Sequence, residues 1–369
     1  MAFRRIGEIG AGPLFPAAGT SGQRAVRRLR GILLEILGFA LVTLLLPLLL
    51  LVALIVDIFR KLTRGKPMVG VRLAVFLWTF LATEMFAMAS LLAIYIASGG
   101  PFGRGGMRRR RGIYWLRPRW ARSHLGMIRL LFGIDLEVEG AEEALPGRYT
   151  IMIRHASIID NMLPDVVVAG PNGLGIRYVV KRELESIPVI DIGGRWIPTQ
   201  FLERVSQDPE GEIATMRRLW QDVGPAEAVL IYPEGTRATQ QKIARAKEII
   251  REKQPDVAPL AETMVNLLPP RLGGPLGLLD EGAGMDVLFI AHAGFDGYEY
   301  ISDIWAGGLV GARVRVKMWR VPAAEIPADE RGRIEWLYEH WQRMDEWVTA
   351  QLADLEHVSA TGKAVVRET

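Results

Sequence analysis

The segment YTIMIRHASIID (Tyr149–Asp160) combines a strand, a turn and the start of a helix in twelve residues. Tyr149–Arg154 is short and apolar on both faces, which is typical of a strand buried inside a sheet. Ser157 is a good helix N-cap, and Asp160 stands three residues later, as in a capping box. A helix is therefore predicted over Ile159–Val168. A strand that leads directly into a helix is the repeating unit of an α/β fold.

The same alternation continues along the chain. Further strands are predicted at Ile176–Val180, Glu227–Tyr232, Met285–Ala293 and Ala312–Val321, and further helices at Gly211–Val223 and Gln240–Lys253. The C-terminal segment IEWLYEHWQRMDEWVTAQL repeats apolar residues at helical intervals, which predicts one closing amphipathic helix. The sequence thus predicts an α/β domain, with a mostly parallel or mixed sheet flanked by helices.

Two long apolar segments precede this domain. Ile36–Val56 has 21 residues without a charge, and Leu73–Ser98 is similar but contains Glu84. About 20 apolar residues cross a bilayer core, so we expect a two-helix membrane hairpin that is not a cleaved signal peptide. The counts of Lys and Arg favour both ends, and hence the catalytic domain, on the cytoplasmic face. A hairpin that enters a single leaflet remains an open alternative.

An arginine-dense stretch, RGGMRRRRGIYWLRPRWAR, follows the second apolar segment and carries eight arginines among aromatic residues. Its position beside a hairpin favours an anionic membrane surface over nucleic acid. The predicted organisation is a disordered basic N-terminus at 1–30, the hairpin at 31–100, a basic interfacial linker at 101–124, the catalytic domain at 125–355 and a tail at 356–369. The chain has no cysteine, which excludes disulfides and a thiolate nucleophile.

His155 and Asp160 are the first candidate reacting pair. On one continuous helix a spacing of five residues turns two side chains about 140° apart, so they meet only if His155 lies on the preceding turn. The simpler interpretation is a helix start with Asp160 as a capping residue, and the two interpretations are compatible.

The second candidate is VLIYPEGTR (Val229–Arg237), an apolar strand that ends in a loop containing Glu234, Gly235, Thr236 and Arg237. Glycine beside a hydroxyl and a guanidinium allows close approach to an anionic oxygen. A plain strand and turn with a solvated arginine would have the same sequence.

Together these blocks resemble the lysophosphatidic acid (1-acylglycerol-3-phosphate) acyltransferase family of glycerolipid acyltransferases, with its H-x4-D and P-E-G-T-R blocks. KRELESIP (Lys181–Pro188) resembles the family's K-x-x-L-x-x-I-P block, and ARAKEIIREK through NLLPPRLGG resembles the branch with a lysine-bearing helix before a leucine-proline-arginine segment. The similarity spans about residues 113–325. The chain departs from the family at Arg154, where Asn is usual, at Asp191, where Gly is expected, and at IAHAGFDG, which lacks a valine-proline pair.

The resemblance implies a membrane-bound enzyme of phospholipid biosynthesis that acylates the sn-2 hydroxyl of lysophosphatidic acid from acyl-CoA. His155 and Asp160 would be the catalytic pair. The expected substrate-binding residues are Lys181, Glu234, Gly235, Thr236, Arg237 and Arg271. Glu234 would organise Arg237 or accept a hydrogen bond from the glycerol. The expected partners are membrane lipids and the two substrates, without nucleic acid.

Several alternatives stay open. One alternative is a different lysophospholipid as the acceptor, and another is acyl carrier protein instead of acyl-CoA as the acyl donor. A third is a membrane-binding protein without activity. No cofactor or metal is expected, because no second histidine lies near His155 in the sequence to complete a metal site. His124, His292, His340 and His357 are expected to be structural or exposed.

Overall fold

The computed structural model describes residues 9–102, 106–202, 208–298 and 301–361. Seven strands form one sheet: β1 (Asp135–Glu139), β2 (Tyr149–Ile153), β3 (Gly175–Lys181), β4 (Thr199–Leu202), β5 (Glu227–Ile231), β6 (Asp286–Ala293) and β7 (Arg313–Val321). Their order in the sheet is β1-β7-β6-β2-β5-β3-β4. All neighbouring pairs are parallel except β6 and β7, so the predicted α/β fold with a mostly parallel or mixed sheet is confirmed.

The five strands predicted from apolar runs are all present. The prediction missed β1 and β4, the two edge strands. β4 has only four residues, and β1 is exposed or half-buried along its whole length. A very short strand and an exposed strand both lack the continuous apolar pattern that reveals central ones.

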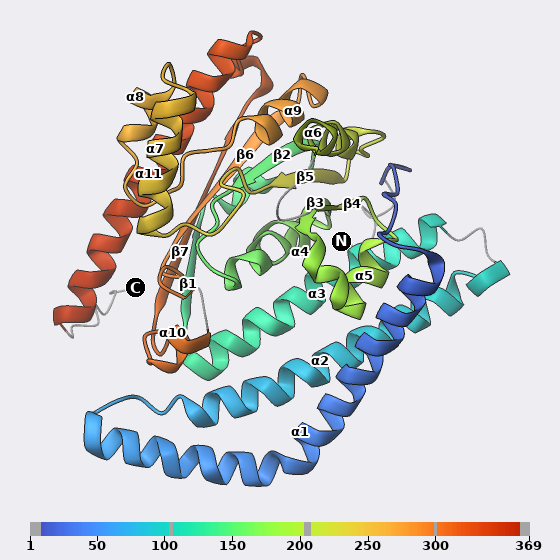
Figure 1. Cartoon of the computed structure of the whole chain (residues 1–369), viewed down its shortest axis with the longest axis vertical. Coiled ribbons are helices and arrows are strands. Elements are labelled where there is room, and N and C mark those ends of the chain that lie inside the picture. Colours follow the sequence, from blue (N-terminus) through green and yellow to red (C-terminus); the bar gives the residue numbers. More distant parts are fainter. Residues whose placement is uncertain (1–8, 103–105, 203–207, 299–300, 362–369) are drawn as a thin grey trace.

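The helices are α1 (Ser21–Arg64), α2 (Gly70–Ala97), α3 (Gly106–Phe132), α4 (Gly170–Asn172), α5 (Pro188–Gly194), α6 (Pro209–Arg217), α7 (Gln240–Lys253), α8 (Ala258–Glu262), α9 (Gly273–Glu281), α10 (Ile301–Trp305) and α11 (Glu330–Thr361). They cover both faces of the sheet (Figure 1). One hydrophobic cluster joins α3 and the segment after β2 to the sheet, and a second joins α6, α8, α9 and α11 to its opposite face.

Two predicted helices differ from those observed. The segment predicted as a helix over Ile159–Val168 is a 3-10 turn at Ile159–Met162 followed by a π-helix at Pro164–Ala169. Pro164 has no N–H to donate, which interrupts a regular α-helical ladder at this point. The helix predicted at Gly211–Val223 is α6, and a 3-10 turn (Arg218–Trp220) completes it. The helix predicted at Gln240–Lys253 is α7, with the same bounds.

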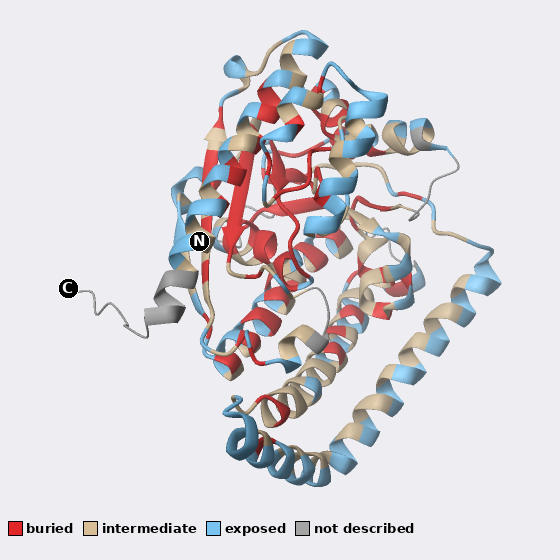
Figure 2. Cartoon of the chain, turned by 60° about the vertical axis from the view of Figure 1, so that its left-hand side comes forward, coloured by how far each residue is buried: buried red, intermediate tan, exposed pale blue. Residues whose placement is uncertain are grey.

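The two apolar segments form helices α1 and α2, which lie side by side as the predicted hairpin. Both are long and apolar enough to cross a membrane, and the most apolar part of α1 buries none of its residues in the protein. α2 packs between α1 and α3, so α1 is the outermost helix, largely exposed along its length (Figure 2). Asp57 closes the turn of the hairpin by accepting the backbone N–H groups of Val69, Gly70 and Val71.

α1 is fastened to the α/β domain near both ends. Near its start, Arg28 Nε lies 2.8 Å from Asp191 Oδ2 and Arg27 pairs with Glu185 at 3.2 Å. Near its end, the Arg60 guanidinium donates to the carbonyl of Trp305 over 2.7 Å. Asp191, the residue found in place of the family's glycine, thus has a structural partner in the hairpin.

The arginine-dense stretch is helix α3, and several of its side chains point into the protein. Arg110 is only 4% exposed, Arg117 pairs with Asp165 at 3.0 Å, and Tyr114 donates to Glu227 over 2.8 Å. The prediction that residues 101–124 form an interfacial linker is wrong for these side chains, because they join the hairpin to the sheet. Residues 103–105 lie outside the described residues.

The two ends of the chain differ from the predicted organisation. Ile9 and Phe15 are buried against the domain and α1 begins at Ser21, so the prediction of disorder is wrong for residues 9–30. α11 continues to Thr361, six residues into the predicted tail at 356–369. Residues 1–8 and 362–369 lie outside the described residues.

Candidate active site

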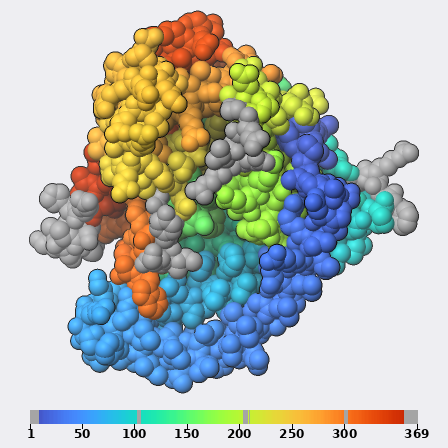
Figure 3. Space-filling model, viewed as in Figure 1, coloured from blue at the N-terminus to red at the C-terminus, as the bar shows by residue number. Residues whose placement is uncertain are grey.

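The predicted site residues come from one edge of the sheet. β2 and β5 are adjacent and parallel, so His155 after β2 and the PEGTR block after β5 emerge at the same edge. Lys181 ends β3, which runs parallel to β5, and is exposed. The carboxyl ends of parallel strands are where open α/β sheets bind ligands. Beside this edge the surface is hollowed between α7, α5 and the hairpin (Figure 3).

His155 and Asp160 form a direct pair. The imidazole Nδ1 lies 2.9 Å from Asp160 Oδ1, and His155 lies on the turn between β2 and the 3-10 segment. Asp160 is fully buried, whereas 11% of the His155 side chain is exposed. The placement that their spacing requires, with the histidine before the helical turn, is the one observed.

The second oxygen of Asp160 is held by the backbone. Oδ2 accepts the N–H groups of Ala156 and Ser157, each over 2.7 Å. Burial opposes the charge on this carboxylate, but the hydrogen bond and charge of His155 hold the pKa of Asp160 below its usual value. Asp160 is therefore an acceptor, His155 Nδ1 carries the proton, and the lone pair of Nε2 is left for chemistry. The capping and pairing interpretations of Asp160 both hold.

Glu234 fastens the two blocks together. One carboxylate oxygen accepts the N–H of His155 over 2.5 Å, and the other accepts the N–H of Leu268 over 3.0 Å. The side chain is 2% exposed, and burial raises its pKa to about 8 against the attraction of Arg154 and the two N–H donors. Glu234 thus shapes the loops around His155 from beneath, a role different from the contact to Arg237 or glycerol that the sequence suggested.

The PEGTR block also contacts both neighbouring segments through its backbone. The N–H of Ala238, next to Arg237, donates to the His155 carbonyl over 2.9 Å. The N–H of Arg271 donates to the Pro233 carbonyl over 2.9 Å, and a Cβ at Gly235 would lie 3.0 Å from Arg271 Nε. Gly235 has φ +66°, a conformation that favours glycine. The segment with Arg271 is thus brought against the loop that holds Arg237, and Thr236 lies half-buried between them.

Sequence reasoning missed His292, on β6 next to β2. Its Nε2 lies 3.6 Å from Asp160 Oδ2, so the statement that no second histidine lies near the pair is wrong in space although it is true along the chain. The signal available was its position near the end of a buried strand that leads to the same edge.

The two remaining departures from the family pattern meet in an ion pair. Arg154 is 1% exposed and its Nη2 lies 2.7 Å from Asp296 Oδ1, in the IAHAGFDG segment. The same guanidinium donates to the His292 carbonyl over 2.6 Å. The charge of Arg154, next to His155, is therefore neutralised by the charge of Asp296, just after β6.

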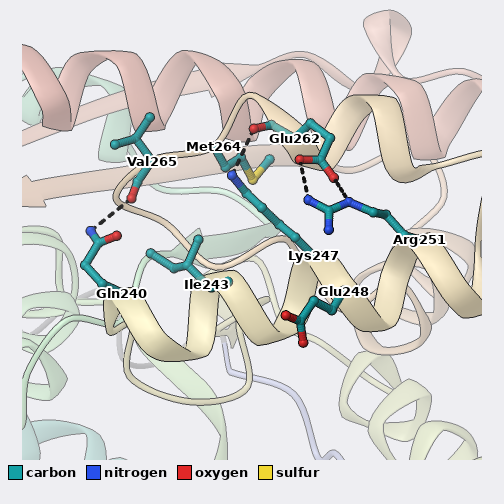
Figure 4. A pocket seen from close by; sticks show the side chains of 9 residues that line it. Gln240, Ile243, Lys247, Glu248, Arg251, Glu262, Met264 and Val265 are labelled. Carbon is teal, nitrogen blue, oxygen red and sulfur yellow. Dashed lines mark hydrogen bonds and ion pairs between the residues drawn. The ribbon is translucent and has the colours of Figure 1, made fainter.

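Within the described ranges, no group of three or more His, Asp or Glu side chains is arranged to hold a metal ion. A separate open cavity of about 350 Å³ lies between α7 and the segment after α8 (Figure 4). There Lys247 bonds the Glu262 carbonyl and Arg251 pairs with the Glu262 carboxylate at 2.5 Å. No predicted site residue lines this cavity, and its charges join α7 to α8.

Comparison with known proteins gives three similarities. Residues 135–259 match the family model described as Acyltransferase. Lysophosphatidylinositol acyltransferase 10 of Caenorhabditis elegans is 20% identical over 230 residues, which are 60% of this chain and 57% of that protein. The chain thus spans little more than half the length of this relative. The crystal structure of the 1-acyl-sn-glycerophosphate (LPA) acyltransferase PlsC from Thermotoga maritima aligns with 74% of this chain and 97% of its own, at 16% identity and a TM-score of 0.46.

Proposed function

We propose that this chain, which matches the Acyltransferase family model over residues 135–259, transfers a fatty acyl group from acyl-CoA to the sn-2 hydroxyl of lysophosphatidic acid, which gives phosphatidic acid. The observation that carries the proposal is the pair of His155 and Asp160 at 2.9 Å, joined to the PEGTR block by the bond from Ala238 to the His155 carbonyl.

His155 is the proposed general base. A hydroxyl group is a poor nucleophile at neutral pH, and removal of its proton by a positioned imidazole contributes about 10²- to 10⁴-fold. Asp160 holds the proton on Nδ1, so that Nε2 faces the acceptor, and stabilises the imidazolium formed in the reaction. The acceptor oxygen attacks the thioester carbonyl, the tetrahedral intermediate expels the CoA thiolate, and the proton on His155 passes to that leaving group. The transfer needs no acyl-enzyme.

The negative oxygen of the tetrahedral intermediate needs hydrogen-bond donors. Several backbone N–H groups near His155 are already used: those of Ala156 and Ser157 by Asp160, that of Gly235 by the Tyr232 carbonyl, and that of Ala238 by the His155 carbonyl. We propose the backbone N–H group of Thr236, in the same loop, as a donor to this oxygen.

Arg237 is the proposed anchor of the lysophosphatidate phosphate, with Lys181 and Arg271 assisting. A guanidinium binds phosphate through two parallel hydrogen bonds. Support comes from position: Lys181 ends β3, Arg237 follows β5, and Arg271 lies against Gly235 in the same loop.

We propose that the hairpin holds this site at a membrane, with the domain on the cytoplasmic face. The unburied apolar surface of α1 supports attachment. The attachment of α1 to one domain near both ends, through Arg28 and Arg60, favours a hairpin that lies within one leaflet over one that spans the bilayer. Because the chain has no native cysteine, a single cysteine introduced at Pro67 in the hairpin turn tests this. Labelling by an impermeant maleimide from the side of the catalytic domain is expected, and labelling only from the opposite side would show a spanning hairpin.

The deciding experiment is thiol release from palmitoyl-CoA with lysophosphatidate, comparing the native protein with His155→Ala. We expect the rate to fall by about 10²- to 10⁴-fold while the thermal unfolding temperature stays within a few degrees. Equal rates above the protein-free background would show that His155 is not the base, and no thiol release by either protein would indicate a membrane-binding protein without this activity. The matched control is His340→Ala, a histidine of α11 that stacks on Phe289.

The same assay separates the remaining alternatives. The name of the Caenorhabditis elegans relative suggests lysophosphatidylinositol as an acceptor. Activity with this lipid and none with lysophosphatidate would show that lysophosphatidylinositol, and not lysophosphatidate, is the acceptor. Activity with acyl carrier protein and none with acyl-CoA would replace the donor. Arg237→Ala should raise the KM for lysophosphatidate much more than the KM for palmitoyl-CoA, because its guanidinium is assigned to the acceptor phosphate.

A further inference from the structure

His292 lies beneath the catalytic pair and is completely buried, so it cannot touch a substrate. It belongs to β6, which runs parallel to β2 with Ile290 opposite Ile153. His155 and His292 therefore stand near the ends of two neighbouring strands. Between them is the carboxylate of Asp160, whose Oδ1 faces His155 Nδ1 at 2.9 Å and whose Oδ2 faces His292 Nε2 at 3.6 Å.

The protonation of His292 follows from its neighbours. Nε2 also lies 3.3 Å from the carbonyl oxygen of Arg154. A carbonyl accepts hydrogen bonds and never donates, so Nε2 carries the proton. Burial lowers the pKa of His292 to about 4, so the ring is neutral at neutral pH. Its Nδ1 has no hydrogen-bond partner among the described residues. The ring thus presents one N–H between the Arg154 carbonyl and Asp160.

This N–H is part of a wider connection between the ends of β2 and β6. Arg154 donates its backbone N–H to the Ile290 carbonyl over 3.4 Å and its guanidinium to the His292 carbonyl over 2.6 Å. Asp296 holds the same guanidinium from the loop after β6. Arg154, directly before His155, is thereby bonded to β6 through its backbone N–H and through its guanidinium. Its carbonyl is in turn bonded by His292.

We propose that His292 is a positioning residue for acyl transfer: its N–H bonds the Arg154 carbonyl and lies beside Asp160 Oδ2, and so keeps the turn in the position at which Oδ1 meets His155 Nδ1. The inference rests on the proposed function, in which His155 is the base. Partners of this kind, which orient a reacting group from behind, typically change activity by about 10- to 100-fold when they are removed.

The variant that tests this is His292→Leu, which removes the N–H and keeps an apolar side chain in an apolar site. We expect kcat to fall by about 10- to 100-fold, with the KM for both substrates within about twofold of native. The acidic limb of the pH profile of kcat/KM should move to higher pH, because an Asp160 carboxylate without the N–H dipole beside Oδ2 favours the protonated imidazole more. The other ionisable groups that face this cluster, Tyr232, Glu234, Arg154 and Asp296, are unchanged.

His292→Gln provides the rescue, since its amide N–H reaches a position near that of Nε2 and carries no charge. We expect it to recover at least half of the lost logarithm of kcat and to restore the position of the acidic limb. The control is His340→Leu, another histidine of the core whose pKa burial lowers and which has no contact with Asp160. It should leave the pH profile unchanged.

The two hypotheses fail in different ways. If His155→Ala is inactive while His292→Leu is folded and keeps the native kcat and pH profile, only the role of His292 is overturned. A shift of the limb to lower pH, or a glutamine variant no better than leucine, would also overturn it. If His155→Ala retains activity, the proposed function itself fails. Should His292→Leu not fold, His292→Met, which also lacks the N–H, takes its place in the comparison with His292→Gln: a slower methionine variant rescued by glutamine supports the inference, and equal kcat values and pH profiles contradict it.

Discussion

Asp160→Asn should stop catalysis by reversing the tautomer of His155. In the native protein Asp160 Oδ2 accepts two backbone N–H groups at 2.7 Å, from Ala156 and Ser157, and Oδ1 accepts only His155 Nδ1. An asparagine amide has one oxygen and one NH₂ group. Its oxygen must take the Oδ2 position, because the reverse orientation would leave two buried N–H donors unpaired at a cost of about 1 to 3 kcal/mol each.

The amide NH₂ group then faces His155 Nδ1, which must become an acceptor. The ring proton moves to Nε2, the atom that should remove the proton from the lysolipid hydroxyl. By analogy with other pairs of histidine and carboxylate, we expect kcat to fall by about 10³- to 10⁴-fold, or about 4 to 5 kcal/mol in the activation free energy. The KM for lysophosphatidate should change little, because Asp160 is buried and makes no contact with the substrate.

The assay is thiol release from palmitoyl-CoA in detergent micelles. Since the chain contains no cysteine, every thiol detected is released CoA. The matched control is Asp57→Asn in the hairpin turn, which also replaces a fully buried carboxylate that accepts three backbone N–H groups. Asp57→Asn should lower the unfolding temperature and leave the pH profile of kcat intact. Activity of Asp160→Asn within tenfold of native would refute the tautomer argument.

Three further predictions concern stability and docking. Glu234→Ala should lower the free energy of unfolding by about 2 to 5 kcal/mol, because it leaves the N–H groups of His155 and Leu268 without an acceptor. Glu234→Gln should lower it by about half as much. Equal losses in a denaturant titration would count against the two hydrogen bonds of Glu234. The pKa of His292 is about 4 in the folded chain against 6.5 for an exposed histidine. Because the unfolded chain takes up the proton first, up to about 3 kcal/mol of the free energy of unfolding that is present above pH 6.5 is lost as the pH falls through 4. His292→Gln should therefore flatten the acid decline in unfolding temperature, and an unchanged decline would contradict this. Asp191→Asn weakens the ion pairs with Arg27 and Arg28, so trypsin should cleave after these two arginines faster than in the native protein. The control is Asp280→Asn, which changes an exposed ion pair. Equal cleavage rates in the two variants would argue against docking of α1.

Much of the fold could be predicted because its central strands are buried on both faces. β2, β5 and β6 are apolar runs between turn residues, and that pattern requires no knowledge of their neighbours. The N-terminal hairpin was predictable for a similar reason, since each of its helices contains a long apolar segment. The edge strands and the π-helix at Pro164–Ala169 were missed, because they depend on what packs around them more than on local periodicity.

The site divides along the same line. The meeting of His155 and Asp160 follows from a local turn, so the six residues from 155 to 160 were enough to suggest it. The inward arginines of α3 and the contact of His292 with Asp160 depend on strands and helices that are distant in the sequence. The sequence alone does not distinguish a buried arginine from one that faces a membrane. The difference depends on whether an acidic partner such as Glu227 or Asp165 lies nearby in the fold.

The closure of the hairpin by Asp57 has a consequence for the order in which the chain acquires its structure. All three N–H groups that Asp57 accepts lie within fourteen residues of it, so this turn can form while most of the protein is still being synthesised. The sheet has no such early option, because β1 at Asp135 pairs with β7 at Arg313. With the proposed membrane attachment, the apolar helices can enter lipid during synthesis, before the sheet and the candidate site at its edge have formed.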